Sequence, residues 1–265
     1  MIPGVGSDRL AVAIAQHTPV PGDVAENARR AATTVAVAAD SGARLLLFPE
    51  LSLTGYDLDR LGDPASWVTV EDPRLDVARE ASRAHGVTTV VGAALLGPDG
   101  GRLLASVALS PDGTVEVVGK RYLHGPERDL FQPGVSARPL VIDGWRIALA
   151  VCYDAAVPEH AREAAEQCAD VYAVSALYTQ GQERRLDLHP AARAMDHRMY
   201  ALVANLAGAG PGWRSCGGSG VWHPDGRRLV EAGTDPQVVI SVLERAELDR
   251  LRADDAKAGY LRPVG

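Results

Sequence analysis

Three side chains whose types suit acyl-transfer chemistry each follow a predicted strand. Glu50 comes after the apolar run 45–48, and Lys120 comes after a predicted hairpin strand that ends near Gly119. Cys152 ends the uncharged apolar run that begins at Ile147. In an α/β sheet, such strand ends converge on one site. A thiol nucleophile, a carboxylate base and a cation beside a developing oxyanion are the parts that acyl transfer needs.

The surroundings predicted for Cys152 and Glu50 should shift their pKa values. Residues 146–162, RIALAVCYDAAVPEHAR, run from a buried strand into a helix whose first turn suits Pro158. Backbone N–H groups and the positive end of a helix lower the pKa of a thiol and favour the thiolate. Burial at a strand end would raise the pKa of Glu50 and make it a better base. Taken singly, Cys152 fits an inert core cysteine equally well, and Glu50 fits a solvated loop acid better.

The elements that must position these residues alternate along the chain. Alternating strands and helices with two inserted hairpins predict one α/β domain over residues 1–265, with a core of about 9–251. A first helix is capped by Asp23 and ended by Gly42. The other predicted helices cover 73–85, 158–167, 189–200 and 246–253. The predicted strands cover 10–15, 45–48, 87–94, 103–110, 115–118, 147–152, 171–175, 202–205, 221–223, 228–231 and 238–243.

Composition narrows the classes of partner and compartment. The formal net charge of −7 argues against nucleic acid or an anionic membrane surface as a partner. Three widely separated cysteines do not make a disulfide framework, so we expect a cytoplasmic protein. No stretch approaches the length of a membrane span. His189 and His197 lie on one predicted helix without the spacing of a metal motif, so we expect no metal and exposed histidines.

Three stretches resemble the motifs of a known family. Residues 47–56, LFPELSLTGY, resemble the glutamate motif of the nitrilase superfamily of carbon–nitrogen hydrolases. Residues 119–123, GKRYL, continuing to 127–134, ERDLFQPG, resemble its lysine motif. Cys152-Tyr153-Asp154, with Pro158-Glu159 and Arg162, resembles its cysteine motif. The resemblance covers about residues 9–251 and points to the amidase-like branch. Further matching landmarks are Ala192-Arg193-Ala194, Asn205, Gly218-Ser219 and Pro224-Asp225-Gly226.

The resemblance implies a fold and a set of roles. The fold it implies is α/β, a four-layer α-β-β-α sandwich of the nitrilase type. By the same resemblance, Glu50 is the general base, Lys120 stabilises the tetrahedral intermediate and Cys152 is the nucleophile. The backbone N–H of Tyr153 would complete the oxyanion hole, and Glu127 would help to position the lysine and the substrate.

The substrate pocket is less well defined by the resemblance. We expect it to include side chains near the three motifs, namely Tyr56, His124, Ala176, Leu177 and Tyr178. The chain departs from the family pattern at Val157, at the segment 175–178 and at His197. These departures concern the pocket and not the three central residues, so they leave the substrate open.

The expected function is hydrolysis of a non-peptide carbon–nitrogen bond in a small amide, without a cofactor. A cysteine thioester acyl-enzyme would form, and ammonia and a carboxylate would be released. A nitrile or an N-carbamoyl compound would use the same parts, and an acyltransferase would replace water by an amine or alcohol. A non-catalytic binding protein of the same fold is the alternative from another class. We also expect a homodimer or larger homo-oligomer, paired through the helices predicted at 158–167 and 189–200.

Overall fold

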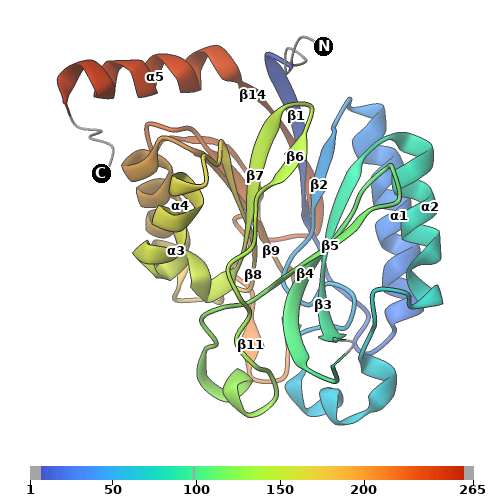
Figure 1. The fold of residues 1–265 in the computed structure, drawn as a ribbon. Coiled ribbons are helices and arrows are strands. Elements are labelled where there is room, and N and C mark those ends of the chain that lie inside the picture. The colour runs from blue at the N-terminus through green and yellow to red at the C-terminus, as the bar shows by residue number, and fades with distance from the viewer. Residues whose placement is uncertain (1–6, 98, 260–265) are drawn as a thin grey trace.

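The computed structural model describes residues 7–97 and 99–259, which build two six-stranded sheets packed face to face (Figure 1). The strand order is β14-β1-β2-β3-β4-β5 in the first sheet and β13-β12-β9-β8-β7-β6 in the second. Strands of the first sheet are β1 (Arg9–Gln16), β2 (Leu45–Leu47), β3 (Thr88–Leu96), β4 (Arg102–Leu109), β5 (Val115–Gly119) and β14 (Gln237–Glu244). Strands of the second sheet are β6 (Leu140–Ile142), β7 (Trp145–Val151), β8 (Val171–Ala176), β9 (Tyr200–Asn205), β12 (Gly220–Trp222) and β13 (Arg228–Glu231). A separate hairpin pairs β10 (Ala209–Gly210) with β11 (Trp213–Arg214).

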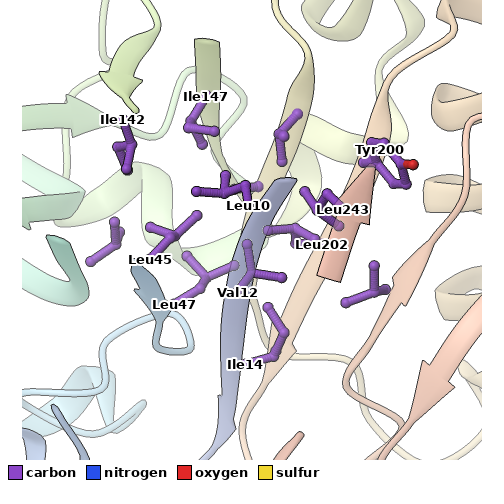
Figure 2. Close-up of a cluster of buried hydrophobic side chains, with 14 of the residues drawn as sticks. Leu10, Val12, Ile14, Leu45, Leu47, Ile142, Ile147, Tyr200, Leu202 and Leu243 are labelled. Atoms are coloured by element: carbon purple, nitrogen blue, oxygen red, sulfur yellow. The ribbon is translucent and has the colours of Figure 1, made fainter. Parts of the chain in front are cut away.

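The period-two pattern of the strands explains why each sheet is buried on both faces. Leu10, Val12 and Ile14 of β1 point into the core between the sheets (Figure 2). Ala13 and Ala15 of the same strand point to the opposite face. Because side chains on both faces are apolar, each sheet needs a second layer on its outer side.

Helices supply those outer layers. On the first sheet lie α1 (Val24–Asp40) and α2 (Asp76–His85), and on the second lie α3 (Pro158–Glu166) and α4 (Glu183–His197) (Figure 1). The buried face of α1 is mostly alanine, which lets it approach the sheet closely. The last helix, α5 (Arg245–Ala258), runs along one end of the sandwich. The predicted α-β-β-α sandwich is therefore confirmed. No helix in the described ranges has both the length and the apolar character needed to cross a membrane.

The largest difference from the predicted elements is in α4. This helix begins at Glu183 and ends at His197, whereas the pattern predicted 189–200. Pro190 lies inside the helix, although a proline there removes one backbone hydrogen bond and its ring crowds the carbonyl four residues earlier. Arg198 adopts a left-handed φ and ends the helix before β9 begins at Tyr200.

The sequence pattern also did not predict several short elements. Strands β6, β10 and β11 were not predicted, because two or three residues carry no periodicity. The segment between the strand predicted at 45–48 and the helix predicted at 73–85 contains the 3-10 helices η1 (Leu58–Gly62) and η2 (Pro64–Ser66). The remaining 3-10 helices are η3 (Pro73–Leu75), η4 (Gly125–Asp129) and η5 (Cys152–Ala156).

Candidate active site

The three strand-end residues lie on one cavity of about 390 Å³, which is lined by Glu50, Lys120 and Cys152 among others. The Nζ of Lys120 lies 2.7 Å from Oε1 of Glu50, and both side chains are completely buried. Glu50 follows β2 of the first sheet, and Cys152 follows β7 of the second. The expected convergence of the three residues is therefore observed, across two sheets.

Cys152 and the residue after Glu50 share an uncommon backbone conformation. The φ of Cys152 is +47°, and that of Leu51 is +49°. Residues with side chains adopt this left-handed conformation rarely, and it persists only where the surrounding structure imposes it. Each buried strand therefore ends in a sharp turn that aims a functional side chain into the cavity.

Gly92 of β3 allows the turn that carries Glu50 to lie against the sheet. A Cβ atom at position 92 would lie 2.4 Å from both the Leu51 nitrogen and the Pro49 oxygen. The Gly92 N–H donates to Oγ of Ser52, and the Gly92 carbonyl accepts from the N–H of Leu53. Sequence reasoning gave Gly92 no role, because the close approach involves residues about forty positions away.

Glu127 provides a second carboxylate that binds Lys120. Its Oε1 lies 2.7 Å from Nζ of Lys120 and accepts the hydroxyl of Tyr56 at 2.7 Å. Its Oε2 accepts the backbone N–H of His124 at 2.8 Å. The carboxylate is buried, so these contacts fix it firmly and hold the ammonium in place.

Burial and charge shift the pKa values of the three central residues. Burial raises the pKa of Glu50 and outweighs the nearby ammonium of Lys120, which lowers it. Burial alone would lower the pKa of Lys120, but the charges of Glu50, Cys152 and Glu127 raise it. Lys120 therefore stays protonated.

The expected lowering of the Cys152 pKa is wrong for the free site. Burial raises the pKa of this thiol, and the Glu50 carboxylate raises it further, whereas Lys120 opposes the rise. The resting residue is therefore a thiol that must lose its proton to a base. Its Sγ lies 3.7 Å from the carbonyl oxygen of Leu177.

The N–H of Tyr153 lies in the first turn of η5, directly after Cys152. Backbone N–H groups in the first turn of a helix lack partners within that helix. Tyr153 also lines the cavity. This is the place where the resemblance implied an oxyanion donor.

The predicted pocket residues are observed at the cavity with one exception. Tyr56, His124, Leu177 and Tyr178 line it. Ala176 does not, because it is the last residue of β8 and its methyl group packs into the core under α3 and α4. The sequence missed other lining residues, which come from η4, η5, the β10–β11 hairpin, and η1 and α4 with the residues just before them: Asp57, Leu58, Asp59, Pro126, Ala156, Thr179, Gln182, Arg185, His189, Pro211, Gly212 and Trp213.

The sequence predicts exposed histidines and no metal site. The prediction that His189 is a surface residue is wrong, since it is half-buried on the cavity wall and its Nδ1 lies 3.3 Å from the Tyr178 hydroxyl. Burial lowers the pKa of His189, and the charges of Arg185 and Arg193 lower it further. Across residues 7–97 and 99–259, no group of three or more His, Cys, Asp or Glu side chains is arranged to hold a metal ion.

Asn205 fixes the segment that carries Leu177 and Tyr178. Its Oδ1 accepts the N–H of Tyr178 at 2.7 Å, and its Nδ2 donates to the Tyr178 carbonyl at 3.1 Å and to the Gly217 carbonyl at 2.7 Å. The side chain is fully buried. The residue that the sequence gave only as a landmark therefore braces one wall of the cavity.

Comparisons with known proteins agree with this geometry. The model of the carbon–nitrogen hydrolase family matches residues 11–253. A hydrolase encoded in the pqqF 5′ region of Pseudomonas protegens is 30% identical over 261 residues, covering 97% of this chain and 91% of the relative. An (R)-stereoselective amidase of a Pseudomonas species is 32% identical over 248 residues, covering 91% of this chain and 86% of the relative.

A solved structure shows the same architecture. A double mutant of the amidase from Nesterenkonia sp. AN1, in complex with acrylamide, superimposes with a TM-score of 0.82 at 27% identity. The match covers 98% of this chain and 100% of the amidase. The chain has two stacked sheets and converging glutamate, lysine and cysteine side chains, and the family model spans nearly its whole length. It therefore belongs to the carbon–nitrogen hydrolase family, within the nitrilase superfamily.

Proposed function

We propose that this enzyme hydrolyses the carbon–nitrogen bond of amides, with Cys152 as the nucleophile. The Cys152 sulfur bonds to the amide carbon while Glu50 takes the thiol proton and the carbonyl electron pair moves to oxygen. The carbon–nitrogen bond then breaks, Glu50 returns the proton to nitrogen, and ammonia leaves a thioester. Water adds to the thioester as Glu50 takes its proton. The carbon–sulfur bond breaks and the proton returns to sulfur, which frees the carboxylic acid.

One observation supports this assignment above all: the free lone pairs of Glu50. Its Oε1 binds Lys120, but its buried Oε2 has no hydrogen-bond partner within the described residues. An unpaired buried carboxylate oxygen is costly, and such atoms mark places where a ligand or a proton completes the site. Cys152 is close enough to Glu50 for each to shift the pKa of the other.

The N–H donors of the Lys120 ammonium group also support this assignment. An ammonium group carries three N–H donors. Glu50 and Glu127 occupy two of them, each at 2.7 Å. The third is left for a substrate oxygen, where it would act together with the N–H of Tyr153. Preorganised donors of this kind are worth about 10²–10³ in kcat each.

The oxyanion donors favour an amide over a nitrile. An amide yields an oxyanion, for which Lys120 and Tyr153 are suited, whereas a nitrile yields a thioimidate nitrogen that must be protonated. The similarity to amidases of Pseudomonas and Nesterenkonia supports the same choice. The cavity of about 390 Å³ also admits acyl groups larger than that of the small amide expected from the sequence.

The test compares kcat/KM for matched amide and nitrile pairs that share an acyl group, from short aliphatic to aryl-alkyl. Ammonia release is the readout, and an N-carbamoyl compound of similar size is included. We expect the amide to be the faster member of each pair. Faster nitriles would overturn the amide assignment and leave the triad standing. No turnover of any member, with tight binding instead, would favour a binding protein.

We make two further proposals, one on domain organisation and one on oligomeric state. We propose that residues 9–251 act as a single hydrolase domain, supported by the pairing of β1 near the start with β14 near the end. We also propose a homodimer or larger homo-oligomer through α3 and α4, supported by the exposed Leu188 and Met195 on α4. Light scattering that finds a monomer at micromolar concentration would contradict the second proposal.

A further inference from the structure

A buried carboxylate that the proposed reaction does not use lies directly behind the site. Asp154 is completely buried, two residues after Cys152. Its Oδ1 accepts the backbone N–H groups of Arg121 at 3.1 Å and of Tyr122 at 2.9 Å. Its Oδ2 accepts the N–H of Val151 at 3.0 Å. Its carboxylate thus accepts three backbone N–H groups.

These three donors belong to the two segments that carry the lysine and the cysteine. Arg121 and Tyr122 directly follow Lys120, which extends from β5 of the first sheet. Val151 directly precedes Cys152, at the end of β7 of the second sheet. The two sheets share no backbone ladder at this point, since β5 pairs with β4, and β7 pairs with β6 and β8.

We infer that Asp154 is a positioning residue that ties the lysine segment of one sheet to the cysteine turn of the other. This inference rests on the proposed roles of Lys120 and Cys152. Hydrogen bonds from N–H groups to a carboxylate are short and roughly twice as strong as neutral ones. One buried carboxylate therefore sets the separation of ammonium and sulfur. Misplacing a reacting group by about 1 Å costs about 10²-fold in rate.

His160 lies against Asp154, and Tyr172 lies against His160. The Nε2 of His160 lies 3.7 Å from its Oδ2, and the Tyr172 hydroxyl lies 2.9 Å from Nδ1 of His160. Burial lowers the pKa of His160, and the charge of Asp154 opposes that shift. Asp154 is absent from the lining of the substrate cavity, so it acts through its neighbours rather than on the substrate.

The chain offers a matched control at the other end of β7. Asp170 is also a buried aspartate, and its Oδ2 accepts the N–H of Arg146 at 3.0 Å, near the start of that strand. It binds the guanidinium groups of Arg245 and Arg252, each at 2.9 Å, far from the cavity. Replacing either aspartate by asparagine removes one buried charge, but only Asp154 adjoins the site.

The test compares Asp154→Asn with Asp170→Asn well below both melting temperatures. For Asp154→Asn we expect kcat for an amide to fall about 10- to 100-fold, with KM changed less than about twofold. For Asp170→Asn we expect a lower Tm and wild-type kcat. A wild-type kcat in Asp154→Asn, or an equal loss of kcat in both variants, would overturn the inference.

A second readout does not depend on amide turnover. Lys120 lowers the pKa of Cys152, so a displaced ammonium should slow alkylation of the thiol by iodoacetamide. We expect slower alkylation in Asp154→Asn and an unchanged rate in Asp170→Asn, with Cys152→Ala as the background. An unchanged rate in both overturns the inference even if no amide is turned over.

If Asp154→Asn does not fold, Asp154→Glu decides the question. This variant keeps the charge and lengthens the side chain by one methylene, so the two segments should move apart. We expect a folded protein whose kcat falls about tenfold at unchanged KM. A folded Asp154→Glu with wild-type kcat would overturn the inference.

Discussion

Two ion clusters of reversed composition lie toward opposite ends of strand β7. In the first, which we name the cavity cluster, the ammonium of Lys120 lies between the carboxylates of Glu50 and Glu127. In the second, the outer cluster, the carboxylate of Asp170 lies between the guanidinium groups of Arg245 and Arg252. The side chains of the cavity cluster are at most 1% exposed, whereas the two arginines of the outer cluster are 22% and 31% exposed.

The two clusters differ in how completely their charges are satisfied. Both oxygens of Asp170 have partners, and the arginines around it reach water. The cavity cluster has one more carboxylate than cations, and Oε2 of Glu50 is without a partner among the described residues. A satisfied, partly exposed cluster stabilises the fold, whereas a buried cluster with a free oxygen is poised to accept a proton. The comparison therefore separates the outer cluster, whose charges stabilise the fold, from the cavity cluster, whose charges serve the reaction.

The largest effect is expected at Cys152, the residue that the cavity cluster would serve. Cys152→Ala removes the proposed nucleophile, and loss of a nucleophile costs about 10⁶ in kcat in a comparable covalent mechanism. The charges of the cluster remain, so we expect the Tm to stay close to that of the wild type. Ammonia release and thermal unfolding measure the two quantities. If the variant keeps more than about a few per cent of wild-type activity, Cys152 is not the nucleophile.

The second prediction removes the central charge of the cavity cluster. Lys120→Met leaves two buried carboxylates without a cation, so kcat should fall about 10²–10³-fold or more and the free energy of unfolding by about 3–5 kcal/mol. Lys120 lowers the pKa of Glu50, so without it this pKa should rise further, and the folded state should bind more protons than the unfolded state. Stability should therefore increase as the pH falls toward the ordinary glutamate range.

The outer cluster provides the contrast to that result. Asp170→Asn removes its central charge, but water solvates the two half-exposed arginines that remain. We therefore expect a smaller loss of stability and no change in kcat. If Asp170→Asn were the more damaging variant for kcat, the division between a chemical and a structural cluster would be wrong.

Sequence reasoning predicted the elements with strong periodicity and the residues at their ends. The strand β1 and the helix α1 were predicted within two residues, and the positions of Glu50, Lys120 and Cys152 followed from strand ends together with family motifs. In each case the signal lies within a short stretch of chain, because period and motif are both local.

What the sequence did not predict depends on contacts between remote segments. Gly92 is needed only because the turn of Glu50 lies against it, and Asp154 gained a role only when β5 and β7 were placed together. His189 lies on the cavity wall because α4 packs beside the segment of Tyr178, a contact that the pattern of the helix alone does not reveal. The raised pKa of Cys152 follows from burial of the thiol and from the nearby Glu50 carboxylate, which a single strand end does not reveal.

The third prediction uses pH to test the excess carboxylate of the cavity cluster. Burial raises the pKa of Glu50, and the charge of Glu127 contributes to the rise. The base must be ionised, so the acid limb of kcat/KM should lie above the ordinary glutamate pKa of about 4.3. Glu127→Gln removes one negative charge, which lowers the pKa of Glu50 and moves that limb to lower pH. It should also lower kcat/KM about 10- to 100-fold, because Lys120 loses a partner.

The control for that experiment is another acid on the same cavity. Asp59 lines the cavity but is exposed, so water screens its charge. Asp59→Asn should leave the acid limb where it is in the wild type. An acid limb that stays in place in Glu127→Gln, or that moves equally in Asp59→Asn, would show that Glu127 is only a loop acid.

The smallest effect is expected at Arg252, in the outer cluster. Its guanidinium binds Asp170 at 2.9 Å and the carbonyls of Ala169 at 2.7 Å and Arg198 at 3.1 Å, which attaches α5 to the second sheet. Arg252→Ala leaves Asp170 paired with Arg245, so no buried charge is stranded. We expect the free energy of unfolding to fall by about 1–2 kcal/mol, with kcat and KM unchanged. Part of that contribution is a half-exposed ion pair, so the difference from wild type should shrink at about 1 M salt, where the Debye length is about 3 Å. Denaturant unfolding at low and high salt measures this difference, and a lowered kcat in the fully folded variant would mean that the two clusters are coupled through β7.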